Sequence, residues 1–283
     1  MYSMETNSVI TIDTKELRFE FGKNWKNFLN TLDEEGILQA EKSLLEFLGE
    51  TSLTGKTFLD IGCGSGLFSL AARRLGAKVH SFDYDTNSVG CVQTLRDRFY
   101  SQDSDWTIEQ GSVLDERYLA ALGSFDIVYS WGVLHHTGAM WNALENITSK
   151  VKQSGKLYVS IYNDQGRMSK IWLEVKKVYN KLPRALRLSY LLLIVIPRES
   201  ASVTMFTLSL NIKGYIYTWT RYKGNRGMNR WHDIVDWIGG LPFEVAKPEG
   251  IVDFYHERGF RLLRLKTCAG GLGCNEYVFE RCG

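Results

Sequence analysis

The stretch Thr57-Phe-Leu-Asp-Ile-Gly-Cys-Gly-Ser-Gly-Leu-Phe68 decides the fold. Its apolar first half predicts a strand that ends near an acidic residue, Asp60, and its three alternate glycines predict a tight turn. Glycine accepts positive φ and lets a ligand lie against bare backbone. A helix that starts near Leu67 would point free N–H groups at that ligand. The stretch therefore predicts a strand–turn–helix unit that binds a small molecule.

A second acidic residue follows the next predicted strand, Lys78-Val-His-Ser-Phe82. This residue is Asp83, about 20 residues after the glycine turn, where an acid can bind the hydroxyl groups of a ribose. Tyr84 follows Asp83 directly and is also expected to bind the ligand. Together the two strand ends indicate a ligand of the nucleoside type.

The spacing of the acid and the glycines separates the candidate nucleosides. Dinucleotide dehydrogenases favour G-x-G-x-x-G, which Phe68 and Ser69 do not complete, and a P-loop would need G-K-[ST] at the end of the turn. The order Asp60-Ile-Gly-Cys-Gly-Ser-Gly66 resembles motif I of the class I S-adenosylmethionine (SAM)-dependent methyltransferases. A carboxylate suits SAM, whose amino group and sulfonium are both positive, and would repel a diphosphate.

The resemblance extends from about Thr57 to Asn163, because further blocks follow in the order that the family shows. These blocks are Gln110–Asp115, Phe125–Ser130 with the loop Trp131–His136, and Gly155–Tyr162. The resemblance implies an enzyme that takes its methyl group from SAM and releases S-adenosylhomocysteine (SAH). Within the family, the chain is most similar to the ubiquinone-biosynthesis-like group that methylates small molecules.

The same resemblance implies which residues hold the cofactor. The first acid and the turn would bind the methionine part, and the second acid would bind the ribose. The block after the third strand would bind adenine, and the end of the fourth strand would lie beside the sulfonium. In this sequence those residues are Asp60, Gly62, Cys63, Gly64, Gly66, Asp83, Tyr84, Ser112, Val113, Ser130 and Trp131.

Helices and strands are expected to alternate through Tyr162, which favours a Rossmann-like α/β fold with a mostly parallel sheet. The helices of this part are expected at residues 66–75, 87–100, 118–122 and 140–152. Two last strands, at 260–267 and 276–280, resemble the antiparallel hairpin that completes the seven-stranded sheet of the family. Residues 1–162 and 250–283 are thus expected to form one catalytic domain, with an N-terminal segment that closes over the cofactor.

Residues 163–249 form a long, mainly helical and aromatic insertion after the fifth strand, expected to act as a cap. Helices are expected at 169–182, at 188–196 and at 202–217, and Pro197 is expected to end the second of them. The apolar run Leu188–Ile196 is about half of the ~20 residues that a bilayer crossing needs, so a transmembrane helix is rejected. A buried cap helix or a dimer contact is favoured for this run, with an interfacial patch for a lipid-linked substrate as the alternative.

Histidines are the candidates for the catalytic base. Open parallel sheets bind ligands beyond the carboxyl ends of their strands, which brings the loop with His135 and His136 to the acceptor side of the cofactor. A hydroxyl or amine acceptor must lose a proton, and histidine has a suitable pKa for accepting it. His136 is the first candidate, His135 the second, and His232 in the insertion the third. A packing role for the loop histidines is the alternative.

A set of aromatic, cationic and hydrogen-bonding residues is expected to bind the acceptor, because such groups suit a sugar ring or an anionic small molecule. These residues are Trp25, Tyr162, Asn163, Arg221, Arg226 and Trp231. The last three belong to a cluster over residues 221–237 that also contains Asp233, Asp236 and Trp237. A solvated helix face with ordinary surface charge is the alternative for this cluster.

Charge and cysteine content limit the partners. The chain of 283 residues has 34 basic and 32 acidic residues, a net charge of +2, which gives no support for a nucleic-acid surface. Its five cysteines lack C-x-x-C spacing, so reduced thiols and no metal site are expected. The first residues do not resemble an export signal, which favours a cytoplasmic location. A homodimer and a peripheral membrane contact stay open.

These features predict methyl transfer from SAM to an oxygen or nitrogen atom of a small-molecule or glycan-type acceptor that the insertion holds. One alternative is a quinone or lipid-linked acceptor, and another is tRNA. The third alternative is a SAM-binding regulatory protein without catalysis.

Overall fold

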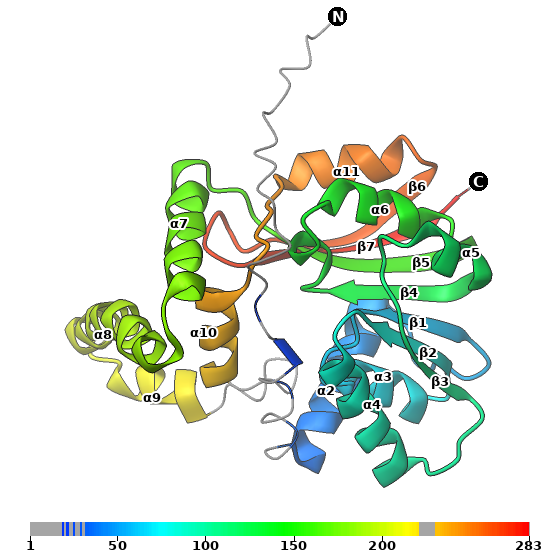
Figure 1. Cartoon of the computed structure of the whole chain (residues 1–283), viewed down its shortest axis with the longest axis horizontal. Helices are drawn as coiled ribbons and strands as arrows, with labels where there is room; N and C mark the ends of the chain where they lie inside the picture. The colour runs from blue at the N-terminus through cyan, green and yellow to red at the C-terminus, as the bar shows by residue number, and fades with distance from the viewer. Residues whose placement is uncertain are drawn as a thin grey trace, which may run out of the picture.

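A seven-stranded sheet forms the centre of the computed structural model of the chain (Figure 1). Its strand order is β3-β2-β1-β4-β5-β7-β6, with parallel neighbours from β3 to β5 and with β7 antiparallel to both β5 and β6. The strands are β1 (Thr57–Ile61), β2 (Lys78–Asp83), β3 (Trp106–Gln110), β4 (Phe125–Trp131), β5 (Val151–Tyr162), β6 (Phe260–Lys266) and β7 (Cys274–Arg281). The predicted Rossmann-like fold with its C-terminal hairpin is confirmed.

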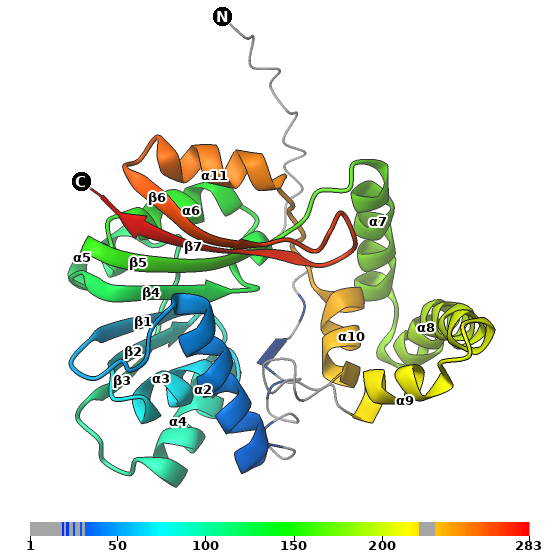
Figure 2. The ribbon, with the colours of Figure 1, turned by 180° about the vertical axis from the view of Figure 1, so that it is seen from behind.

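The structure describes residues 32–220 and 230–282, with Phe19, Phe21, Gly22, Trp25 and Leu29 from the N-terminal part; the side chain at 232 lies outside this description. Helices cover both faces of the sheet (Figures 1 and 2). One face packs against α2 (Glu34–Leu48), α3 (Leu67–Arg74) and α4 (Thr86–Phe99). The other packs against α5 (Glu116–Ala121), α6 (Met140–Thr148) and α11 (Pro248–His256).

The two apolar cores follow from the pleat of the strands. Successive side chains of a strand point to opposite faces, so Phe58 enters the core under α2 and α3, and Leu59 enters the core under α6. Both faces are covered by helices, and for this reason the parallel strands read as nearly continuous apolar runs. The helices keep the sheet rigid, and the carboxyl ends of β1, β2 and β4 are left to carry loops.

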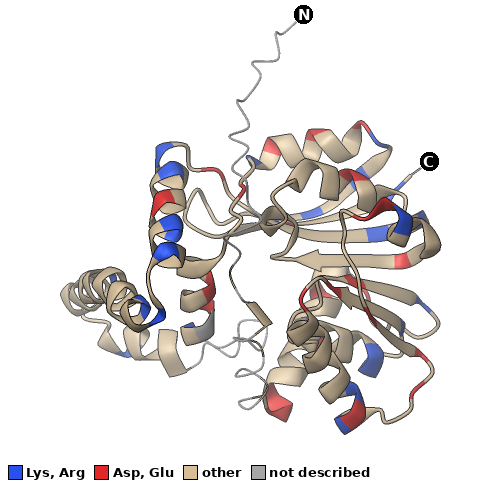
Figure 3. Ribbon diagram, viewed as in Figure 1, with Lys and Arg blue, Asp and Glu red and all other residues tan. Residues whose placement is uncertain are grey.

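Four helices lie beyond one end of the sheet, between β5 and α11 in the chain (Figures 1 and 2). They are α7 (Arg167–Lys181), α8 (Arg184–Leu208), α9 (Ile212–Thr220) and α10 (Arg230–Gly239). Tyr179, Leu191, Val195 and Ile238 form a small apolar cluster within them, separate from the cores of the sheet. Figure 3 shows Lys and Arg positions along α7 and near one end of α8. We propose that these four helices form the expected cap.

The expected end of a helix at Pro197 is wrong. α8 continues through Pro197 to Leu208, and the helix expected at 202–217 is divided between α8 and α9. Proline removes one backbone N–H, and the bond lost is the one to the carbonyl of Leu193, four residues earlier. Pro197 and Leu193 are both exposed, so solvent lies beside the missing bond. The rest of the helix keeps its hydrogen bonds, and its apolar pattern resumes after Arg198 and Glu199.

The length argument against a bilayer crossing is therefore also wrong. With 25 residues α8 is long and apolar enough to cross a membrane, by length and composition alone, and 11% of its apolar window is buried. Among the residues that the structure describes, α8 is one helix with these properties.

Another boundary differs at the start of β5. The helix expected at 140–152 ends at Thr148, and β5 begins at Val151 instead of 155. Val151 pairs with Phe125 and Lys156 with Ile127, so the residues between them form a bulge in the ladder. A polar segment that bulges from a strand has no alternation of apolar and polar residues. The sequence therefore does not predict a strand at residues 151–154.

Two leucines on α2 test the packing of this face. Leu44 is fully buried, whereas Leu38 on the same helix is 50% exposed. We expect Leu44→Ala to lower the free energy of unfolding by about 2–5 kcal/mol, because it removes apolar contacts and leaves a cavity. Leu38→Ala should lower it by less than about 0.5 kcal/mol. Urea unfolding followed by circular dichroism measures both, and similar losses in the two variants would contradict this orientation of α2.

Candidate active site

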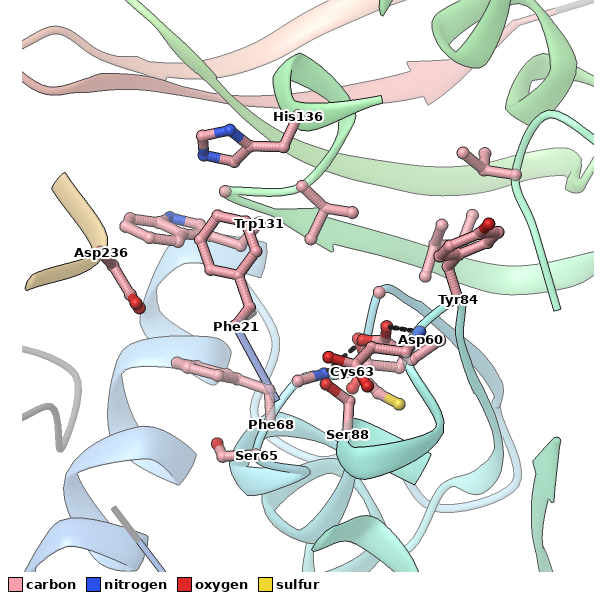
Figure 4. A pocket seen from close by; sticks show the side chains of 18 of the residues that line it. Phe21, Asp60, Cys63, Ser65, Phe68, Tyr84, Ser88, Trp131, His136 and Asp236 are labelled. Carbon is pink, nitrogen blue, oxygen red and sulfur yellow. Dashed lines mark hydrogen bonds between the residues drawn. The ribbon is translucent and has the colours of Figure 1, made fainter. Parts of the chain in front are cut away.

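A cavity of about 1060 Å³ lies at the carboxyl ends of β1, β2 and β4 (Figure 4). Its lining comes from the turn after β1, the residues after β2, the loop after β4, α10 and the loop between β6 and β7. Sites for one small molecule usually have about 300–1,000 Å³. This cavity therefore has room for a nucleoside cofactor and a separate acceptor.

The glycine turn after β1 has the predicted conformation. Gly62, Gly64 and Gly66 have φ of +72°, +54° and +81°, which residues with a side chain rarely adopt. The N–H groups of Gly62 and Cys63 donate to the carbonyl of Phe82, at 2.9 and 3.2 Å, and so attach the turn to the end of β2. A Cβ atom on Gly62 would lie 2.3 Å from Cγ1 of Val133, so no other residue fits there without a shift.

Two predicted cofactor residues have structural roles instead. Gly66 caps α3 and packs tightly against Val92, and it does not line the cavity. Ser130 is fully buried, and its hydroxyl donates to the carbonyl of Ile61 at 3.1 Å, which joins β4 to β1. Both residues lie in the segments where the sequence predicts them. At these two positions the backbone faces the core and not the cavity.

Asp60 is a carboxylic acid almost completely removed from water. It is 2% exposed, lines the cavity, and accepts a hydrogen bond from the hydroxyl of Ser69 at 2.5 Å. Burial raises its pKa to about 7; the bond from Ser69 opposes this shift, and the negative charge of Asp83 adds to it. A cationic amino group in the cavity would favour the ionised form, which is the role predicted for Asp60.

Asp83 connects the glycine turn to the start of α4. Its Oδ2 accepts from the N–H of Gly64 at 3.0 Å, and its Oδ1 accepts from the N–H of Asp85 at 2.9 Å. Burial raises the pKa of Asp83 to about 6, and the hydrogen bonds from the backbone act in the opposite direction. Each carboxylate oxygen can accept a second bond, so Asp83 can hold the turn and also bind ribose hydroxyl groups.

The other predicted cofactor residues lie along the same part of the cavity. Val113 is buried and Ser112 partly buried, and the hydroxyl of Ser112 accepts from the N–H of Leu114 at 3.2 Å. Tyr84 is exposed at the edge of the cavity, as Figure 4 shows. Burial raises the pKa of the Cys63 thiol, which keeps it protonated and makes it an apolar part of the wall.

Aromatic side chains line much of the cavity. Trp25 and Phe68 lie near the glycine turn, and the others come from the opposite part: Phe19, Phe21, Trp131, Tyr162 and Trp237. Figure 4 shows Phe21 and Trp131 near Asp236, away from the carboxylate of Asp60. The aromatic part therefore offers a flat apolar binding surface beside the predicted position of the sulfonium.

The N-terminal segment touches both halves of the molecule. The N–H of Phe19 donates to the carbonyl of Leu241 in the insertion, and the N–H of Gly22 donates to the carboxylate of Asp85. The indole of Trp25 lies 3.0 Å from the position of a Cβ on Gly64. Trp25 of this segment therefore lies against the glycine turn at one side of the cavity.

His136 lines the cavity and extends into it from the loop after β4 (Figure 4). Its Nδ1 lies 2.5 Å from the carbonyl oxygen of Pro242. Because a carbonyl oxygen only accepts, Nδ1 carries the proton, and Nε2 of the neutral ring is the nitrogen that can take one up. The ring also contacts Phe21 and Tyr162, with centroids 4.9 and 5.3 Å away.

His135 cannot serve as the catalytic base, because it does not reach the cavity. Its side chain is fully buried, with its ring 3.9 Å from the ring of Tyr162. Burial, with the nearby His136 and Lys176, holds the pKa of His135 well below its ordinary value, so it stays neutral. The packing role, which was the alternative for the loop histidines, applies to His135.

The predicted acceptor residues separate into three groups. Tyr162 and Trp25 line the cavity. Asn163 does not; its side chain bonds with Asn275 and with the carbonyl of Gly271, so it connects the end of β5 to the hairpin loop. Trp231 is 38% exposed on α10 and lies outside the cavity lining. Arg221, Arg226 and the side chain of His232 lie outside the described residues.

Three other residues of the predicted cluster do line the cavity: Asp233, Asp236 and Trp237, all on α10. Their spacing of three and four residues puts them on one helix face. The sequence analysis instead selected the arginines and Trp231 from this cluster. Helix periodicity would have distinguished Asp233 and Asp236 from Trp231 once the start of α10 was known.

Lys176 is a residue behind the site that the sequence analysis missed. It is fully buried on α7, donates to the carbonyl of Trp237, and lies 4.8 Å from the ring centroids of Trp237 and Phe243. Burial lowers its pKa to about 7, which the carboxylate of Asp236 opposes. One signal was present: Lys176 is four residues after Trp172 and three before Tyr179, on the apolar face of the helix.

The fold and the glycine turn with its two acids define a class I SAM-dependent methyltransferase. A family model described as a methyltransferase domain matches residues 34–192, and the chain belongs to this family.

Curated relatives match less than half of the chain. The ribosomal protein L11 methyltransferase of Helicobacter hepaticus is 30% identical over 137 residues, which are 48% of this chain and 39% of that protein. The ubiquinone biosynthesis O-methyltransferase of Paraburkholderia xenovorans is 32% identical over 112 residues, 39% of this chain and 46% of that protein. The chain therefore spans less than half the length of these relatives.

Solved structures match more of the chain at lower identity. Magnesium protoporphyrin IX methyltransferase from Synechocystis PCC 6803, with bound SAH, has a TM-score of 0.51 and 16% identity over 87% of this chain and 84% of that chain. PKMT2 from Rickettsia typhi has a TM-score of 0.54 and 13% identity over 89% of this chain and 53% of that chain. At these identities the likeness shows the fold alone.

Replacement of Gly62 tests the turn. Gly62→Ala combines positive φ with a contact on Val133, whereas Gly55→Ala has a similar φ of +78° with open space around it. Both variants should lose about 1 kcal/mol of stability. Only Gly62→Ala should lower the affinity for SAH, by about tenfold or more, because Val133 must move into the cavity.

Calorimetric titration with SAH measures the affinity of both variants. Equal affinities of the two variants would contradict the account, and adding Val133→Ala should restore part of the loss.

The raised pKa values of Asp60 and Asp83 predict how SAH binding depends on pH. The cationic amine of SAH favours ionised carboxylates, so at low pH the protein must release protons when it binds. We expect the affinity to rise from about pH 5 to about pH 7 and then to level off, by at most about tenfold per pH unit for each proton. Asp60→Asn should bind more weakly and show a flatter dependence. Calorimetry over this range checks both, and a wild-type affinity that falls with pH would contradict the assignment.

Proposed function

We propose that the protein transfers a methyl group from SAM to an oxygen or nitrogen atom of a small molecule with a flat, largely apolar body. The observation that carries the proposal is one cavity with two chemically different ends. Asp60, Asp83 and the glycine turn form one end, and aromatic side chains with His136 form the other.

The first end suits the cofactor. Asp60 and Asp83 would bind the amino group and the ribose, and Ser112 with Val113 would lie at the adenine. SAM supplies a methyl group already activated by the sulfonium. The two buried carboxylates suit its positive charge, because a cation offsets the cost of ionising them away from water.

The second end suits an acceptor that must lose a proton. Phe21, Trp131 and Tyr162 would hold a planar molecule by ring contacts and exclude water. His136 would accept the proton of the hydroxyl or amine at Nε2, while the bond from Nδ1 to Pro242 fixes its tautomer and its orientation. Asp233 and Asp236 add negative charge at this end, which would stabilise the protonated imidazole or a cationic group of the acceptor.

Several features of the cavity and of α8 favour some of the alternatives over others. A glycan has less support, because Trp231, chosen for sugar binding, lies outside the cavity lining. The acidic residues of the cavity weigh against tRNA, whose phosphates they would repel. An aromatic acceptor end with an oriented histidine weighs against a purely regulatory SAM-binding protein. A lipid-borne acceptor such as a quinone is the second candidate, favoured by the exposed apolar face of α8.

The proposed compartment is the cytoplasm. The cysteines lack C-x-x-C spacing, which favours reduced thiols and supports this compartment.

Substitution of His136 tests the proposed base. His136→Gln keeps a polar group but cannot accept the proton, so turnover should fall by about 10²–10⁴-fold, while SAH affinity stays within about twofold. His256→Gln, on an exposed position of α11, is the matched control and should have no effect. The measurement is SAH release with a panel of aromatic alcohols, phenols and amines. Full activity of His136→Gln on an accepted substrate would overturn this role.

A further inference from the structure

The outer side of α8 and α9 carries an apolar surface, named here the cap surface. Its main side chains are each at least half exposed: Leu186, Leu193, Ile196, Met205, Leu208 and Ile216. Figures 1 and 2 show that these two helices lie at the end of the molecule farthest from the sheet. Extended exposed apolar patches on soluble proteins usually mark a site of interaction with a protein or a membrane.

α8 is attached to the rest of the protein along one face only. Leu191 and Val195 on that face are buried in the cluster shared with α7 and α10. Glu199, one turn further on, forms an ion pair with Arg230 of α10 at 2.8 Å. These residues are spaced by four, so the attached face extends over several turns, and the cap surface lies on the other side. A helix held this way cannot be surrounded by lipid, but it can lie flat in the interface.

Helices α7, α8 and α9 carry a positive charge. Residues 167–220 contain nine Lys or Arg, of which Lys176 is buried, and two Asp or Glu, a formal net charge of +7 in a chain whose total is +2. Both acids are paired, Glu174 with Lys177 and Glu199 with Arg230. Figure 3 shows the basic residues along α7 and near the start of α8. Leu193 and Ile196 lie between Arg187 and Arg198 in the sequence, and Lys213 follows Leu208, so basic residues are interspersed with the apolar ones along α8 and α9.

The charge distinguishes between the two occupants that could cover this surface. In a symmetric dimer the same patch would meet itself, and the positive groups around it would repel each other. A membrane with anionic lipid offers both an apolar interior and negative headgroups, each basic residue contributing to the attraction. The combination of exposed leucines and surrounding Lys and Arg is typical of helices that lie in such an interface.

We propose that the cap surface docks on a membrane that contains anionic lipid, with α8 lying in the plane of the interface. This proposal goes beyond methyl transfer and does not depend on it. It has one consequence for the site: α10 contacts α8 through Arg230 and forms a wall of the cavity through Asp236. The acceptor end of the cavity is therefore joined by one helix to the docked surface.

Flotation of the full-length protein with lipid vesicles tests the proposal. The protein should float with vesicles of phosphatidylcholine and phosphatidylglycerol, and markedly less with phosphatidylcholine alone or at high salt. Leu193→Glu with Ile196→Glu should lower the partition constant by about tenfold or more on anionic vesicles, because two apolar side chains no longer enter the bilayer. Lys181→Glu with Lys213→Glu should lower it by about tenfold on the anionic vesicles and leave the weak binding to neutral ones unchanged.

The control pair is Leu38→Glu with Leu263→Glu, two exposed leucines on α2 and β6 that should leave flotation unchanged. Circular dichroism and SAH titration, which should be the same for all variants, show that each is folded and separate this test from that of methyl transfer. Three results would overturn the proposal: no flotation of the wild type, equal flotation on both kinds of vesicle, or cap variants that float like the wild type. A stable dimer by light scattering that the leucine variants dissociate, without vesicle binding, would show that a second copy covers the surface.

Discussion

The burial of Asp60 beside bare backbone is the constraint on which the rest of the structure depends. A carboxylic acid that is 2% exposed and whose pKa is raised to about 7 destabilises the ligand-free protein when it ionises. Asp83, with a pKa raised to about 6, lies close enough to add to this cost. The sheet and its helices hold both groups there. A positively charged ligand offsets the cost, so the fold favours cations of the size of an amino-acid nucleoside.

The two ends of the cavity are built in different ways. The cofactor end comes from the carboxyl ends of β1 and β2, where backbone N–H groups hold Asp83 and the turn in place. The acceptor end depends on the insertion: the carbonyl of Pro242 orients His136, and α10 supplies Asp236 and Trp237. Lys176 supports this wall from behind through the carbonyl of Trp237.

Much of the fold and the cofactor end could be predicted from the sequence, because both depend on local patterns. Alternating strands and helices, Asp60 with its glycines, and Asp83 are each encoded within a few residues. Gly66 and Ser130 lie outside the cavity lining, since a pattern predicts the strand and the turn but not the side of the backbone that faces the core. The acceptor end was predicted less well, because His136 and His135 are neighbours and only long-range packing buries one of them. A proline after an apolar run predicts a helix end, because the pattern does not show that the backbone hydrogen bond missing at Pro197 lies beside solvent.

A calorimetric titration of the protein with SAH and, separately, with NAD tests directly whether Asp60 and Asp83 select a cationic nucleoside. We expect saturable binding of one SAH per chain and no heat with NAD, because a diphosphate would meet the carboxylates of Asp60 and Asp83. Tight binding of NAD together with no heat from SAH would contradict it.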